Sequence, residues 1–340
     1  MTKGDVLDVK GVPTNKGSGL WLERAAEELG VETYQLAYIG DGWYDWLMAG
    51  HAAVFYLHAN WAAPLPPKVI AYVADEPADV LGLVTHFLLL PPRWKFTLDQ
   101  SRFGLCVRSL HSALDTLPRD RAGSSFNVKD VFTYGRAVPI GEEDVRDLLM
   151  LHAVSSLYLE GLITPYSLFA VYPSSTPGHT NRKIQGFLEP VSKLFHGYFQ
   201  PNLLVRAVQD KDTSFYRWRG RSDEVSYLDQ TNTVHLNPEH ASKIGRKNRT
   251  VLVFDDFTTT GRTLDWARNL LYAAGAGRVV LLTVGKYPSP YFLHLPREGE
   301  CITPFEHTTY TRAQFHRTSI SMDRHLEAKP IIQQSSKLVF

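Results

Sequence analysis

The stretch that most constrains the fold of this chain is residues 251–263, which read VLVFDDFTTTGRT. Its first four residues are apolar, as in a buried strand of a parallel sheet. Two adjacent carboxylates, Asp255 and Asp256, follow that strand, and a loop of hydroxyls with one glycine leads to a helix beginning near Leu264. In α/β proteins, ligands bind in the crevice outside the carboxyl ends of the strands. The order of elements therefore predicts an α/β fold with a ligand site at this loop.

The residue types in this motif indicate a ligand that carries both hydroxyl and phosphate groups. The paired carboxylates suit the adjacent hydroxyls of a ribose, because carboxylate oxygens accept the hydrogen bonds that these hydroxyls donate. The backbone N–H groups of a loop at a helix N-terminus suit a phosphate. A sugar phosphate fits both halves of the motif. The alternative is an ordinary buried strand followed by a polar turn into a helix.

Position by position, the stretch resembles the phosphoribosyl-pyrophosphate (PRPP) binding motif of type I phosphoribosyltransferases. The resemblance implies that Asp255 and Asp256 hold the ribose and are the catalytic residues, with Asp256 as a general base. It also implies that Mg²⁺ is the cofactor, held mostly by substrate oxygens and waters. The loop that would bind the 5-phosphate consists of Thr258, Thr259, Thr260, Gly261, Arg262 and Thr263.

An upstream segment resembles the pyrophosphate loop of this family, especially that of its ComF-like (competence-associated) members. A strand ends in a polar turn near residue 173, and the sequence NRKIQGF follows at 181–187. Gln185 stands where ComF-like members have arginine, so the match to that subgroup is incomplete. The alternative is a solvated basic loop. The residues implied as donors to pyrophosphate are Ser174, Ser175, Arg182 and Lys183.

Residues 204–221, here called the flap segment, resemble the flexible loop that covers the bound sugar in this family. The segment begins near Arg206 and contains Arg217, Arg219 and Arg221, whose charges would neutralise pyrophosphate as the loop excludes water. Two alternatives remain open. Trp218 and its neighbouring arginines could stack on and contact a single-stranded nucleic acid, or the segment is plain surface.

The N-terminal region resembles the C-terminal half of haloacid dehalogenase-like (HAD-like) phosphohydrolases. The elements that carry the likeness are NKG at 15–17 and GDGWYD at 40–45. The resemblance implies that Lys16 steadies a phosphate and that Asp41 and Asp45 hold a metal ion. The alternative is a Rossmann-like strand–helix–strand unit whose acids cap a turn.

The phosphohydrolase nucleophile is missing from this region. The family places it in an Asp-x-Asp loop well before the lysine element, but seven residues separate Asp8 from Lys16, too few for the intervening strands and helices. We therefore expect a half-domain without phosphatase activity of its own. A half-domain of this kind would expose a sheet edge. That edge predicts an oligomer or complex. Either another chain supplies the missing half, or the domain is a relic used for docking.

Strands and helices alternate along the chain, which predicts a parallel sheet. The partial HAD-like domain is expected over 1–92, and the phosphoribosyltransferase-like domain over 93–340, with a core at about 142–286 and a tail at 287–340. Residues 91–140 read as irregular. The acceptor site is expected to come from residues 95–140 of this segment and from 286–330, with Lys286 and Tyr287 just past the last core strand. Strands are expected at 6–9, 34–39, 53–57, 168–171, 202–208, 251–254 and 279–284, and helices at 19–29, 44–49, 78–90, 142–161, 183–199 and 264–274.

Composition limits the partners. The 340 residues are 44% apolar and 21% charged, ordinary values for a globular protein. The net charge of +1 gives no bulk attraction to nucleic acid or membrane. Cys106 and Cys301 have neither metal-site spacing nor a disulfide framework, which favours a reducing compartment. The chain has no run of 18 uncharged apolar residues, so no membrane span is expected. Taken with the charge and the cysteines, this predicts a cytoplasmic protein without a membrane or nucleic-acid partner.

Together these features predict a Mg²⁺-dependent phosphoribosyltransferase or PRPP-binding protein that acts on a base or nucleotide-related acceptor. Two alternatives stay open. One is an enzyme of N-glycosidic cleavage or phosphoribosylation in a stress or antiviral nucleotide system. The other is a non-catalytic PRPP or nucleotide sensor, or an assembly subunit of a stress or antiviral complex.

Overall fold

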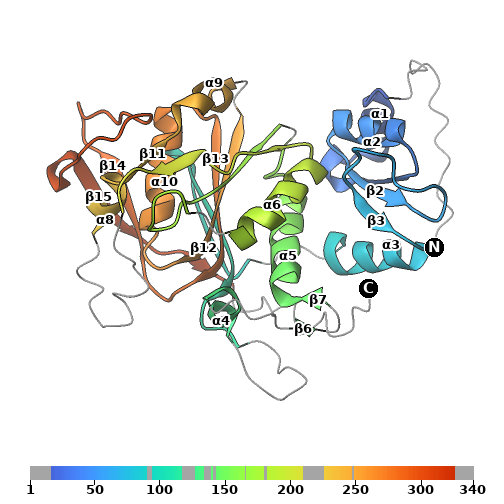
Figure 1. Ribbon diagram of the computed structural model, residues 1–340, viewed down its shortest axis with the longest axis horizontal. Helices are drawn as coiled ribbons and strands as arrows, with labels where there is room; N and C mark the ends of the chain where they lie inside the picture. Colours follow the sequence, from blue (N-terminus) through green and yellow to red (C-terminus); the bar gives the residue numbers. More distant parts are fainter. Residues whose placement is uncertain are drawn as a thin grey trace.

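The fold has two parts, a small N-terminal unit and a larger unit built around one twisted sheet (Figure 1). Both are taken from a computed structural model of the chain. It describes residues 17–89, 94–116, 127–133, 139–140, 143–164, 166–179, 182–209, 226–246 and 249–325.

The larger sheet confirms the prediction of a mostly parallel α/β arrangement. Among the described residues it has seven strands, in the order β16-β4-β5-β13-β12-β8-β9. The five from β5 to β9 run parallel, while β4 and β16 add an antiparallel edge. The strands are β4 (Phe96–Gln100), β5 (Leu105–Ser112), β8 (Leu168–Val171), β9 (Tyr198–Phe199), β12 (Thr250–Thr258), β13 (Arg278–Lys286) and β16 (Asp323–Arg324).

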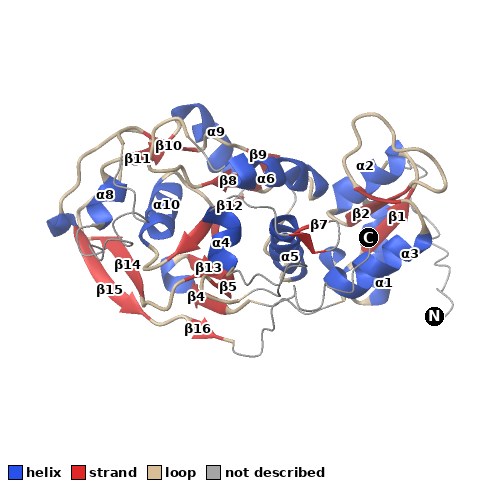
Figure 2. Cartoon of the chain, turned by 60° about the horizontal axis from the view of Figure 1, so that its bottom comes forward, coloured by secondary structure: helices blue, strands red, loops and turns tan. Residues whose placement is uncertain are grey.

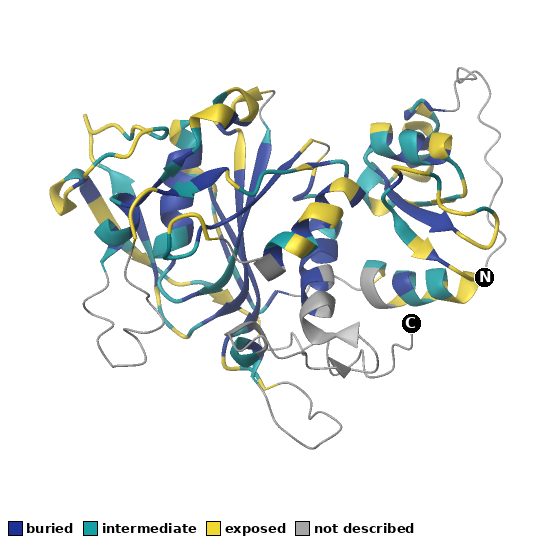
Figure 3. Cartoon of the chain, in the orientation of Figure 1, coloured by how far each residue is buried: buried dark blue, intermediate teal, exposed yellow. Residues whose placement is uncertain are grey.

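Each face of this sheet has its own core (Figures 2 and 3). On β12, Leu252 and Phe254 pack with helices α5 (Val145–Leu159) and α6 (Arg182–Leu194). Val251 and Val253 pack on the opposite face with α10 (Arg262–Ala273). Such two-sided burial explains the uninterrupted apolar run in the sequence. No helix in the described part of the chain is long and apolar enough to cross a membrane.

The expectation that 91–140 is irregular was wrong for residues 96–112. These residues form β4 and β5, and β5 pairs with β13 near the middle of the sheet. The polar residues of β5 hid its strand character. Arg108 is buried, but its guanidinium forms ion pairs of 2.9 Å with Asp99 and with Glu160. The core sheet therefore begins well before residue 142, and β5 is structural.

Shorter elements surround α10 and the sheet. The tail forms a hairpin, β14 (Tyr291–Pro296) with β15 (Phe315–Ile320), and β14 packs on α10. A second antiparallel pair is β10 (Leu204–Arg206) with β11 (Val234–Leu236). The remaining short elements are α4 (Val128–Thr133), β6 (Pro139–Ile140), β7 (Glu143–Asp144), α8 (Tyr227–Thr231) and α9 (Ala241–Ile244).

The N-terminal unit is a three-stranded parallel sheet in the order β1-β2-β3, with one helix between β1 and β2, one before β1 and one after β3. Gly30 ends the first helix in the left-handed conformation, with φ of 67°, as its sequence position predicts. β3 was missed because it follows a proline-rich stretch. The elements are α1 (Leu20–Leu29), β1 (Ala37–Gly40), α2 (Trp43–Ala52), β2 (Phe55–Ala59), β3 (Tyr72–Ala74) and α3 (Pro77–Leu83). The helix expected over 78–90 is present as α3, which continues directly into a π-helical segment at Val84–Leu88.

The two units share one hydrophobic core. Phe55 of β2 packs its ring against Tyr158 of α5 and against Phe195. The Tyr158 hydroxyl also donates to the Leu36 carbonyl at 3.1 Å and accepts from the Phe55 N–H at 2.9 Å. Because buried backbone groups need partners, these two bonds fix the small unit on α5. The N-terminal unit is thus an integral layer of the fold.

Candidate functional site

The two adjacent acids lie at the carboxyl end of β12, which runs four residues past the expected end of the strand to Thr258. The Thr263 hydroxyl donates to Asp255 Oδ2 at 2.8 Å, and the Asp256 N–H donates to Asp255 Oδ1 at 3.0 Å. The Phe257 N–H donates to Asp256 Oδ1 at 2.7 Å. Both acids remain half-buried at the crevice. The side chains of strand, acids and first helical turn therefore form one connected site.

The electrostatics of the pair favour a ligand that donates hydrogen bonds or carries positive charge. Burial, together with the negative charge of Asp256, holds the pKa of Asp255 well above its ordinary value of 3.8. The hydrogen bond from Thr263 acts in the opposite direction and only partly offsets this rise. Sugar hydroxyls, which donate hydrogen bonds, and cations are groups that two adjacent carboxylates can bind.

Gly261 makes the turn from β12 into α10. Its φ of 80° lies in the left-handed region, and an added Cβ would overlap the ring of the buried Tyr291. The Gly261 N–H donates to Thr258 Oγ1 at 3.1 Å, which closes the loop. Among the described residues no side chain caps the first turn of α10. The N–H groups of that turn are thus suited to an anion.

Lys286 anchors the loop from behind. Its ammonium group donates to the carbonyls of Thr259 at 2.9 Å, Tyr287 at 2.9 Å and Ser289 at 2.5 Å. Burial lowers the pKa of this lysine to about 8. The side chain is 2% exposed, so the expectation that it contacts an acceptor was wrong. The sequence did contain a signal for this buried role. Lys286 stands at the end of an apolar strand, and a lysine buried there needs acceptors for its ammonium group.

One polar atom of the loop is unsatisfied. The hydroxyl of Thr259 is buried and has no hydrogen-bond partner among the described residues. Buried hydroxyls in folded proteins nearly always have a partner. Because the same residue's carbonyl is held by Lys286, the backbone here is fixed, and a bound oxyanion would supply the missing acceptor.

The expected pyrophosphate loop lies next to the acid pair. β8 and β12 are parallel neighbours, and the Tyr172 N–H donates to the Phe254 carbonyl at 2.8 Å. The Ser174 hydroxyl donates to the carbonyls of His179 at 2.8 Å and Thr176 at 3.1 Å, which closes residues 174–179 into a turn. Ser175 is half-buried in this turn. The structure therefore brings the two predicted loops to adjacent strand ends.

Arg206 was expected at the start of the flap segment as a contact for pyrophosphate, and it is buried instead. Its Nε donates to the Ser174 carbonyl at 2.5 Å, and its Nη1 donates to Thr233 Oγ1 at 2.6 Å. The guanidinium also reaches the Pro173 carbonyl at 3.5 Å. Arg206 thus joins β10 to the loop after β8, a role that depends on backbone carbonyls and leaves little trace in a sequence.

Several predicted residues cannot be placed. Lys16, Arg217, Arg219 and Arg221 lie outside the described residues. Arg182 and Lys183 open α6, but their side chains lie outside the described part of the structure.

The two acids of the N-terminal unit have different surroundings. Asp41 is exposed, whereas Asp45 is buried at the start of α2. Asp45 Oδ2 accepts from the N–H groups of Asp41 at 3.3 Å and Gly42 at 3.0 Å, and Oδ1 accepts from the Tyr38 hydroxyl at 3.1 Å. This is the pattern of a helix cap. Within the described ranges no three His, Cys, Asp or Glu residues gather as a metal site.

Comparison with protein-family models, with curated proteins and with solved structures found no match to this chain. The functional argument therefore rests on the site itself.

Proposed function

We propose that the chain binds PRPP at the carboxyl ends of β8 and β12 and acts as a Mg²⁺-dependent phosphoribosyltransferase on a base or nucleotide-related acceptor. The observation that carries the proposal is the connected site at the end of β12. Two carboxylates, a hydroxyl-rich loop and an uncapped helix start lie within residues 255–263. A ribose 5-phosphate moiety has a complementary group for each of these.

Asp255 and Asp256 would accept hydrogen bonds from the ribose 2- and 3-hydroxyls. The 5-phosphate would lie in the loop of residues 258–263, where Gly261 leaves the backbone accessible and Thr259 has a hydroxyl that lacks a partner. The pyrophosphate would extend toward Ser174 and Ser175 on the neighbouring strand end, with Arg182 and Lys183 as further donors. Arg217, Arg219 and Arg221 of the flap segment are proposed to neutralise its charge.

The carboxylate oxygens of Asp255 and Asp256 are suitable ligands for a hard divalent cation such as Mg²⁺. Carboxylate oxygens are the ligands that Mg²⁺ accepts, and it keeps several waters and substrate oxygens in such sites. Burial and the negative charge of Asp256 raise the pKa of Asp255, and a cation bound beside the pair would oppose that rise. Asp255 and Asp256 would contact the hydrated ion together with PRPP. When bound, Mg²⁺ supplies charge neutralisation for the leaving pyrophosphate.

The proposed reaction is displacement at ribose C1. The C1–O bond to pyrophosphate breaks, positive charge develops on the ribose ring, and a nitrogen of the acceptor forms the new C1–N bond. The site would hold the reactants in line and stabilise the charge on the departing group. Asp256 would take the proton that the attacking nitrogen loses, which requires its carboxylate form.

The leading alternative is PRPP or nucleotide sensing without turnover, as an assembly subunit of a complex. The N-terminal unit favours it, because its buried acid serves as a helix cap and its edge strand β1 carries Ile39 with 46% exposure. An exposed apolar edge is where another chain, including one that completes a HAD-like domain, would dock.

Turnover separates the two readings. The full chain with Mg²⁺, PRPP and a panel of purine and pyrimidine bases should release pyrophosphate with at least one base. Binding of PRPP without pyrophosphate release would support the sensor hypothesis over the transferase hypothesis. Absence of PRPP binding would contradict both.

A further inference from the structure

A second pocket lies on the side of α10 away from the sheet, between α8 and the hairpin of β14 and β15. Its volume is about 370 Å³, within the range of small-molecule sites. Arg262, the first residue of α10, also lines it, so the pocket adjoins the loop of residues 258–263 without containing the acid pair. The lining residues are Ser226, Tyr227, Leu228, Arg262, Phe292, His294, Arg312, Phe315 and Arg317.

The lining of this pocket is strongly cationic. Three arginines, Arg262, Arg312 and Arg317, come to it from α10 and from the β15 strand with the residues just before it. None of the described residues that line it carries a carboxylate. Two acids lie near the lining without belonging to it. Asp265 is fully buried and paired with Arg268 at 3.0 Å, and Asp229 Oδ2 accepts from the Ser226 N–H at 2.6 Å. Guanidinium groups that converge in this way bind phosphate or carboxylate.

The pocket also presents flat π surfaces. The guanidinium of Arg317 lies over the ring of Phe292, 3.6 Å from its centroid, and Arg317 is exposed to solvent. A guanidinium stacked on one ring can stack on a second with its outer face. Tyr227 and His294 stack in parallel at 3.7 Å on another wall. An aromatic ligand has suitable contacts here.

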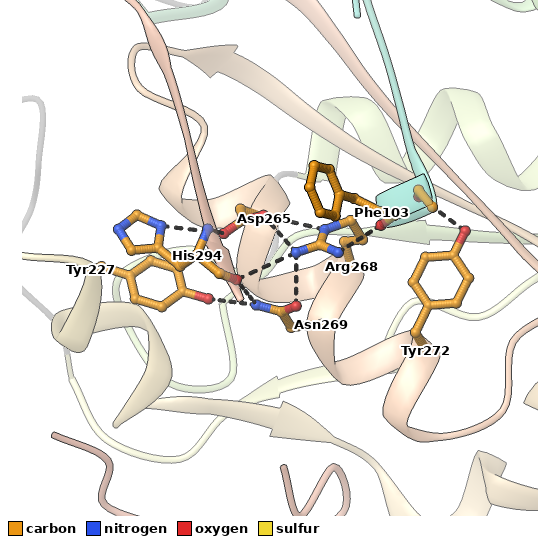
Figure 4. A network of polar contacts seen from close by, with 8 residues as sticks. Phe103, Tyr227, Asp265, Arg268, Asn269, Tyr272 and His294 are labelled. Atoms are coloured by element: carbon orange, nitrogen blue, oxygen red, sulfur yellow. Dashed lines mark hydrogen bonds and ion pairs between the residues drawn. The ribbon is translucent and has the colours of Figure 1, made fainter. Parts of the chain in front are cut away.

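A buried polar network fixes that wall in place (Figure 4). Asp265 Oδ2 accepts from the His294 N–H at 2.8 Å, and the Asn269 amide donates to the Tyr227 hydroxyl at 2.8 Å. The same amide donates to the His294 carbonyl at 2.8 Å, while Arg268 donates to Asn269 Oδ1 at 2.8 Å. With these groups satisfied by one another, the pocket wall is ordered before any ligand binds.

We propose that this pocket is a second ligand site for a molecule that combines an aromatic ring with a phosphate, the chemistry of a nucleoside monophosphate. The arginines would bind the phosphate, and the ring would stack on Arg317 and the neighbouring aromatic residues. The site differs from the sugar-phosphate crevice, because Asp255 and Asp256 do not line it. Because Arg262 belongs to both the pocket and the phosphate loop, a ligand bound in the pocket can affect that loop. The proposal does not depend on the transferase reaction.

The test is calorimetric titration of the full chain with AMP, GMP, CMP and UMP, each in the absence of PRPP. At least one should bind, while adenosine and inorganic phosphate, each lacking one half of the ligand, should bind at least about 10-fold more weakly. The double variant Arg312→Ala/Arg317→Ala should weaken binding by about 10-fold or more. Arg297→Ala removes an exposed arginine of the same hairpin that does not line the pocket, and it should change nothing.

The variant Asp255→Asn/Asp256→Asn separates this pocket from the crevice, which could also take the ribose 5-phosphate of a nucleotide. It should keep one nucleotide site, whose affinity falls by about 10-fold or more when Arg312→Ala/Arg317→Ala is added. The arginine double variant should in turn keep its PRPP affinity. The proposal would be overturned if no monophosphate binds, or if adenosine or phosphate alone binds equally well. It would also be overturned if binding is lost in the aspartate variant but kept in the arginine variant. Both arginines are exposed, and thermal melting shows whether the variants remain folded.

Discussion

Two loops of this molecule have the same local plan, a parallel strand followed by acids, glycine and a helix. In the N-terminal unit, β1 leads through Asp41 and Gly42 into α2. In the larger unit, β12 leads through Asp255, Asp256 and Gly261 into α10. In the first loop, Asp45 caps the helix with both carboxylate oxygens. In the second, the N-cap residue Gly261 has no side chain to cap the helix, and both acids are half-buried.

The difference teaches how to tell a helix cap from a ligand site. Asp45 accepts hydrogen bonds from two N–H groups at the start of its own helix, whereas Asp255 accepts from the Asp256 N–H and the Thr263 hydroxyl and, within the described residues, caps no helix N–H group. Burial and the neighbouring charge of Asp256 raise the pKa of Asp255, as often happens to carboxylates at functional sites. The sequence pattern is shared, but the surrounding partners decide the role.

The largest effect is expected from Gly261→Ala. The added methyl group would overlap the Tyr291 ring, and φ of 80° is strained for alanine, so the phosphate loop must move. We expect PRPP affinity to fall by about 100-fold or more, measured by calorimetry. Gly299→Ala is the matched control, because Gly299 has a φ of 83° with open space around it. Equal binding by both variants would show that the loop does not hold the ligand.

Asp45→Ala should affect stability and leave binding unchanged. The substitution removes the acceptor for two N–H groups and the Tyr38 hydroxyl in a buried position, which costs about 1–3 kcal/mol of unfolding free energy. Denaturant unfolding measures this loss. Asp79→Ala removes a less buried cap of the same kind from α3 and should cost less. A tenfold loss of PRPP affinity in Asp45→Ala would contradict the assignment as a cap.

Lys286→Met should weaken PRPP binding by about 10-fold, equivalent to about 1.4 kcal/mol. The reason is that the Thr259 carbonyl loses the donor that fixes the phosphate loop. The direct measurement is PRPP titration of the variant at neutral pH. The control is Lys243→Met, an exposed lysine that bonds to Gln200 outside the site. Unchanged affinity in Lys286→Met would show that the anchor is dispensable.

A smaller effect is a pH dependence that originates at Asp255. Because its folded pKa is raised above 3.8, the folded state holds the proton more tightly than the unfolded state. The unfolding free energy should therefore decrease as the pH rises from 3.8 through the raised pKa, by at most about 1.4 kcal/mol per pH unit. PRPP affinity should increase over the same range, because the ionised carboxylate accepts the ribose hydroxyls.

Asp255→Asn tests this assignment. Its unfolding free energy, measured in denaturant at a series of pH values, should lack the part of the pH dependence that Asp255 contributes. An unaltered pH profile in the variant would assign the effect to another group.

β12, its loop and α10 were predictable because an apolar run and a glycine before a helix can be recognised from adjacent residues alone. β5 was missed because the partners of Arg108 include Glu160, 52 residues away. The anchoring roles of Arg206 and Lys286 were missed because their partners are backbone carbonyls, which every residue has. The pocket of three arginines was also missed, since it joins residues from α10 to those near β15.

The central claim is that Asp255 and Asp256 hold a sugar phosphate, whereas the otherwise similar acids of the N-terminal unit do not. It is tested most directly by calorimetric titration of PRPP with Mg²⁺ into the wild-type chain, Asp255→Asn/Asp256→Asn, and Asp41→Asn/Asp45→Asn. The account predicts binding to the wild type and to the N-terminal variant, and none to the β12 variant while it remains folded. Equal binding by all three proteins, or loss in the N-terminal variant alone, would contradict it.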